Sequence, residues 1–91
     1  MSNWANVVLL YKHEHGFEVI AGDFTPPGEE SFPAIGVRWP WFPAAPVVLP
    51  EMFALPILTT VLTELGRAPA DATKDARRKR VLVELERITG K

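Results

Sequence analysis

The chain has 91 residues, of which 47% are hydrophobic, and a formal net charge of −1. This length predicts a single small domain spanning residues 1–91, and the near-neutral charge excludes a global field that would attract nucleic acid or membrane. The chain has no cysteine. Disulfides, thiolate catalysis and cysteine-based zinc sites are therefore excluded, which fits the reducing cytoplasm where we expect the protein to reside.

Residues 5–24 have the pattern of a β-hairpin. Residues 5–13 are rich in β-branched and aromatic side chains, which favours a strand. Both faces of this strand are apolar, so we expect it to be central or covered on both sides. Gly16 can adopt a positive φ and predicts a short turn into a returning strand over residues 17–24.

A proline- and glycine-containing loop over residues 25–31 precedes a third predicted strand. In residues 34–39, Ile35, Val37 and Trp39 alternate with Gly36 and Arg38, which predicts an antiparallel strand. Proline cannot donate to a ladder, so this strand is expected to stop at Pro40.

Residues 39–50 form an uncharged run with four prolines and three aromatic residues. Proline fixes φ and removes a hydrogen-bond donor, so this run can be neither a regular helix nor a central strand. It must therefore pack on the chain's own core or contact a partner. Trp39, Trp41 and Phe42 are the candidates for an interface, since aromatic residues are enriched in interface cores. The alternative is that they cover the open end of a small core.

Residues 51–66 show helical spacing of apolar side chains. The stripe comprises Ala54, Ile57, Leu58, Val61, Leu62 and Leu65. The helix begins either near Leu55, with Pro56 in its first turn, or at Pro50 with a bend at Pro56; Pro50-Glu51 is a good start signal and favours the longer helix.

A second helix is predicted over residues 71–89. Asp71 or Thr73 could cap its N-terminus, and Gly90 follows its end. Its expected apolar face comprises Val81, Leu82, Leu85 and Ile88. The fold class is thus α+β: a three-stranded antiparallel sheet followed by two C-terminal helices packed on one face, in the order βββαα.

A membrane span over residues 39–63 is disfavoured, although that stretch has only one charge. Its prolines and the central Glu51 argue against a continuous apolar helix. The N-terminal residues also lack the basic and then apolar layout of a signal peptide.

Charge is uneven along the chain: residues 1–50 carry a net of −3 and residues 71–91 a net of +3. The basic end holds the candidates for nucleic-acid contact, Lys74, Arg77, Arg78, Lys79 and Arg80. Consecutive residues spread around a helix at about 100° each, so these side chains cannot all meet one groove. A solvated helix face is the simpler interpretation.

His13 and His15 alternate, and on a strand they would point the same way. With Glu18 or Asp23 they could bind a metal, but two histidines at a turn fall short of a metal-ligand signature. The chain also lacks a nucleophile motif and a glycine-rich phosphate loop. We therefore expect no catalysis, no cofactor and no bound metal.

The leading hypothesis from sequence is a small non-enzymatic interaction or accessory protein that contacts a second copy or another protein through the apolar proline- and tryptophan-rich segment and one face of the helices. The specific prediction is a homodimer. The alternative is a small regulator that contacts DNA or RNA through the basic C-terminal helix. Salt dependence of binding to generic nucleic acid distinguishes the two.

Overall fold

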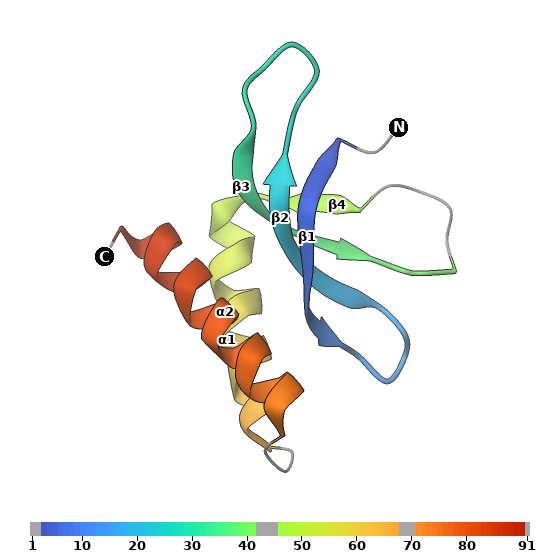
Figure 1. Cartoon of the computed structure of the whole chain (residues 1–91), viewed down its shortest axis with the longest axis vertical. Coiled ribbons are helices and arrows are strands. Elements are labelled where there is room, and N and C mark those ends of the chain that lie inside the picture. Colours follow the sequence, from blue (N-terminus) through green and yellow to red (C-terminus); the bar gives the residue numbers. More distant parts are fainter. Residues whose placement is uncertain (1–2, 42–45, 68–70, 91) are drawn as a thin grey trace. The chain divides into compact units, whose positions relative to one another are not determined.

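The computed structural model describes residues 3–41, 46–67 and 71–90. The chain divides into two compact units, Met1–Leu49 with the β-strands and Pro50–Lys91 with the helices (Figure 1). An antiparallel sheet and two helices that follow it confirm the predicted α+β class. That the whole chain forms one domain, with the helices on one face of the sheet, stays a prediction.

The described part of the first unit forms a four-stranded sheet in the order β1-β2-β3-β4, and each neighbouring pair is antiparallel. The strands are β1 (Trp4–Lys12), β2 (Glu18–Phe24), β3 (Phe32–Arg38) and β4 (Val47–Leu49). Successive strands are neighbours, so the sheet is a simple meander in which local turns set most of the pairing.

The prediction of three strands was wrong, because β4 was missed. This short strand pairs with β3 through Val47, Val48 and Leu49 and lies at the sheet edge. Pro46 and Pro50 flank it directly. The proline rule that excludes a central strand still permits an edge strand between prolines, since its outer side needs no ladder partner.

The prediction that the first strand is central or covered on both sides was wrong, because β1 lies at the other edge of the sheet and most of its residues are exposed or half-buried. This edge strand is irregular. Its register with β2 shifts between Ala5 and Val8 and again between Leu9 and Tyr11. Asn6 in the first shift has a φ of 54°, and its Nδ2 donates to Asp23 Oδ2 at 2.9 Å. Such bulges bend an edge strand and make it a poor template for pairing with another chain.

One face of the sheet is built around Trp4. This side chain packs in a buried cluster with Ile20 and Ala34 and contacts the ring of Phe24 at 5.4 Å between centroids. A Cβ added at Gly36 would lie 2.8 Å from Trp4 Cη2. The indole therefore occupies the space that the missing side chain of Gly36 leaves open.

The second unit consists of α1 (Glu51–Arg67) and α2 (Ala72–Thr89), which run in opposite directions (Figure 1). Helix α1 begins directly after Pro50, whose carbonyl accepts from the N–H groups of Phe53 and Ala54 at 2.9 Å. This confirms the longer of the two predicted helices, with Pro56 inside it. The buried residues of α1, at spacings of four, three and four, are Ala54, Leu58, Val61 and Leu65.

Both predicted ends of α2 are confirmed. Asp71 caps its N-terminus by accepting from the N–H of Lys74 at 2.8 Å, and Gly90, with a φ of 77°, ends it in the left-handed conformation. Val81 is buried as expected, whereas Leu82 is exposed. The charged Glu84 is also buried, and Arg80 and Arg87 both bond to its carboxylate.

Candidate functional site

Aromatic side chains gather at the end of the sheet where the β1–β2 turn lies. Phe17 contacts Trp39 at 5.7 Å between ring centroids, and His13 stacks on Phe17 at 4.6 Å with an interplanar angle of 14°. We call this group, together with its neighbours, the aromatic surface. It comprises Tyr11, His13, His15, Phe17, Trp39 and Trp41.

The β1–β2 turn that carries the two histidines is held by three hydrogen bonds. The N–H of His13 donates to the carbonyl of Phe17 at 2.9 Å, and the N–H of Gly16 donates to the carbonyl of His13 at 2.8 Å. The N–H of His15 donates to His13 Nδ1 at 3.1 Å. Gly16 has a φ of 100°, so the turn needs glycine there, as predicted.

Trp41 lies directly on this turn. A Cβ added at Gly16 would overlap the six-membered ring of Trp41, so the indole approaches the glycine backbone as closely as a missing side chain allows. Even so, Trp41 is 65% exposed. The indole is thus positioned on the turn without being buried.

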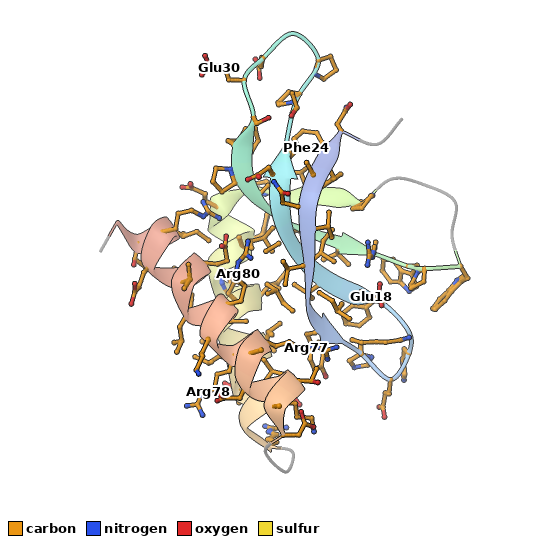
Figure 2. The ribbon with its side chains drawn as sticks, in the orientation of Figure 1. Glu18, Phe24, Glu30, Arg77, Arg78 and Arg80 are labelled. Carbon is orange, nitrogen blue, oxygen red and sulfur yellow. The ribbon has the colours of Figure 1, made fainter. Side chains whose placement is uncertain are left out.

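Trp39 is the second exposed indole, at 43% exposure. Its position follows from the pairing of Glu18 with Arg38, which places the next residues, Phe17 and Trp39, side by side. Arg38 Nε donates to Glu18 Oε1 at 2.8 Å, and Glu18 is buried. A charged pair thus fixes the strand register directly beside the aromatic surface, and Figure 2 labels Glu18 at this end of the sheet.

The structure therefore brings together residues that the sequence suggested separately. Trp39 and Trp41 were interface candidates, and His13 and His15 were a weak metal candidate; all four belong to one surface. Phe42, the third interface candidate, lies outside the described residues. Tyr11 and Phe17 were missed as site residues, although the opposite charges of Glu18 and Arg38 were a signal for the register that places Phe17 beside Trp39.

Among residues 3–41, 46–67 and 71–90, no group of three or more histidine, aspartate or glutamate side chains could hold a metal ion. In the same part of the chain, neither helix is long and apolar enough to cross a membrane.

The basic residues of α2 are dispersed and largely engaged with acids of their own helix. Lys79 pairs with Asp75 at 3.3 Å, and Arg80 pairs with Glu84 at 3.2 Å. Arg78 and Arg80 point to opposite sides of α2 (Figure 2). The predicted angular spread is confirmed by this view. Lys74 and Arg77, the remaining candidates, are half-buried.

Arg87 adds to this engagement. Its Nε and Nη2 donate to Glu84 Oε1 at 3.0 and 2.9 Å, so one buried carboxylate binds two guanidinium groups. Charge-assisted bonds of this kind position the arginines along their own helix. They leave Arg78 as an exposed cation whose side chain makes no ion pair within the described part of α2.

No protein-family model, curated protein or solved structure matches this chain.

Proposed function

We propose that this protein is a small, non-enzymatic, cytoplasmic interaction protein that associates with a second copy of itself through the aromatic surface. The observation that carries the proposal is the position of Trp41, seated on the backbone of Gly16 and 65% exposed. Large aromatic side chains with little freedom and much accessible area are the residues that dominate binding energy in protein interfaces.

The charges beside the aromatic surface favour a second copy as the partner. Lys12 and Glu14 flank His13, are both exposed, and make no ion pair within the described residues. A surface that pairs with itself about a two-fold axis brings residue i against residue j and j against i. Lys12 of each copy can then meet Glu14 of the other, so the surface is complementary to itself in charge.

The sheet edges disfavour a different mode of self-association. Two bulges interrupt β1, and β4 has three residues between Pro46 and Pro50. Both are devices that prevent strand-to-strand pairing with another chain. Association through side chains at the end of the sheet is therefore the mode that the described residues support.

Sedimentation velocity of the wild type and of Trp41→Ala tests the proposal. At tens of micromolar, a range in which weak dimers are populated, the wild type should sediment as a dimer and the variant as a monomer. Phe53→Ala is the matched control, since Phe53 is also aromatic and is 55% exposed but belongs to the first turn of α1. A monomeric wild type, or equal loss in both variants, contradicts the proposal.

A further inference from the structure

His13 has a hydrogen bond that only its neutral form can make. Its Nδ1 accepts from the N–H of His15 at 3.1 Å. A histidine nitrogen that accepts a hydrogen bond carries no proton, so the ring proton of His13 is assigned to Nε2. Protonation would place a hydrogen on Nδ1 as well and convert this acceptor into a donor.

The same ring contacts the rest of the aromatic surface. It stacks on Phe17, which in turn contacts Trp39, and it meets the ring of His15 at 4.9 Å between centroids and that of Tyr11 at 6.3 Å. The turn that its backbone closes includes Gly16, on which Trp41 lies. A change at His13 therefore reaches Trp39 by way of Phe17, and Trp41 by way of the turn at Gly16.

The charged groups around His13 do not compensate a positive ring fully. Lys12 precedes it, and the Glu14 carboxylate is exposed to water, which weakens its attraction. From β2, Glu18 is already bonded to Arg38. A proton on His13 thus adds a positive ring next to Lys12 and leaves Glu14 as the single acid beside it without an ion pair in the described residues.

We propose that His13 is a pH-sensitive switch for the aromatic surface: its neutral form adds a side-chain hydrogen bond to the turn on which Trp41 lies, and its protonated form loses that bond. The inference rests on the proposed self-association. Because the neutral form is the one that supports the surface, association should be strongest above the titration range of histidine and should weaken as pH falls from about 8 to about 5.5. The expected loss is about three- to tenfold in dimer affinity, the worth of one hydrogen bond.

Sedimentation equilibrium at the two pH values, with variants of each histidine, tests the switch. In His13→Asn the amide oxygen can still accept from the N–H of residue 15 but does not titrate, so association should change less than twofold with pH. His15→Gln is the matched control, since it keeps His13 and should keep most of the pH dependence. Equal affinity of the wild type at both pH values, or full pH dependence in His13→Asn, overturns the proposal.

A second readout on dilute, monomeric protein separates failure of the switch from failure of self-association. In NMR spectra, the His15 amide and the indole N–H signals of Trp39 and Trp41 should shift together as the wild type is acidified, and the indole signals should stay in place in His13→Asn. If the wild type never dimerises, the proposed function fails while these shifts still decide the switch. Indole signals of the wild type that do not move between about pH 8 and about pH 5.5 would refute the switch.

Discussion

The aromatic surface and the basic residues of α2 both contain candidates that were chosen by residue type. The aromatic residues lie together in the structure, whereas the basic residues of α2 do not. Strand pairing brings Phe17, Trp39 and His13 from separate segments into one surface. In α2, the cations are contiguous in sequence but diverge in space, and Lys79 and Arg80 pair with acids of the same helix. Contiguity in sequence is thus a poor guide to a site on a helix, whereas a strand register can assemble one from distant residues.

The largest loss of stability and of dimerisation should come from a side chain added at Gly16, which would fill the space next to Trp41. Gly16→Ala would place a methyl group inside the indole ring and also strain a residue with a φ of 100°. We expect a loss of about 2–4 kcal/mol in the free energy of unfolding, measured by urea denaturation, together with loss of dimerisation.

Gly28→Ala is the control for that strain. Gly28 also has a positive φ, of 78°, but a Cβ there would meet nothing within 4 Å. It should cost about 1–2 kcal/mol from backbone strain alone and leave dimerisation unchanged. Equal losses of unfolding free energy in Gly16→Ala and Gly28→Ala would mean that the contact between Trp41 and Gly16 contributes nothing to stability.

Reversing the charges beside the aromatic surface should have a smaller effect on dimer affinity. Lys12→Glu and Glu14→Lys should each weaken dimerisation about two- to fivefold, because each replaces an attraction across the interface with a repulsion. The double variant Lys12→Glu/Glu14→Lys restores opposite charges and should recover most of the affinity, as measured by sedimentation equilibrium at low salt. Additive losses of dimer affinity in the double variant would exclude the pairing of Lys12 in one copy with Glu14 in the other.

Substitutions of arginine in α2 should have the smallest effect on dimerisation and on the free energy of unfolding. Arg77→Ala/Arg78→Ala should leave dimerisation unchanged, and Arg78→Ala should change the free energy of unfolding by less than about 0.5 kcal/mol, since Arg78 is exposed. Any binding of the wild type to random duplex DNA, followed by fluorescence anisotropy, should be weak and lost as salt rises. A genomic fragment bound far more tightly than random DNA, with that preference lost in Arg78→Ala, would favour the nucleic-acid alternative instead.

Several local signals in the sequence predicted the local structure. Gly16 marked the β1–β2 turn, Pro50-Glu51 marked the start of α1, and Asp71 and Gly90 marked the ends of α2. Each of these depends on conformational preferences of a few consecutive residues. Such preferences can be identified without knowledge of the tertiary structure.

Features that depend on distant partners were missed. The bulges in β1 arise from its pairing with β2, and β4 forms only because β3 offers it an edge. Burial of Glu84 requires two arginines to neutralise it, which a hydropathy pattern cannot show. The aromatic surface belongs to the same category, because it depends on register rather than on any single motif.

The three tryptophans allow the central claim to be tested in one measurement on the unmodified protein. Trp39 and Trp41 belong to the aromatic surface, whereas Trp4 is buried in the sheet unit. NMR spectra recorded from roughly 20 to 500 micromolar, which spans weak dimerisation, should show the indole signals of Trp39 and Trp41 moving with concentration while that of Trp4 stays in place. Three signals that are equally insensitive to concentration would contradict self-association through the aromatic surface.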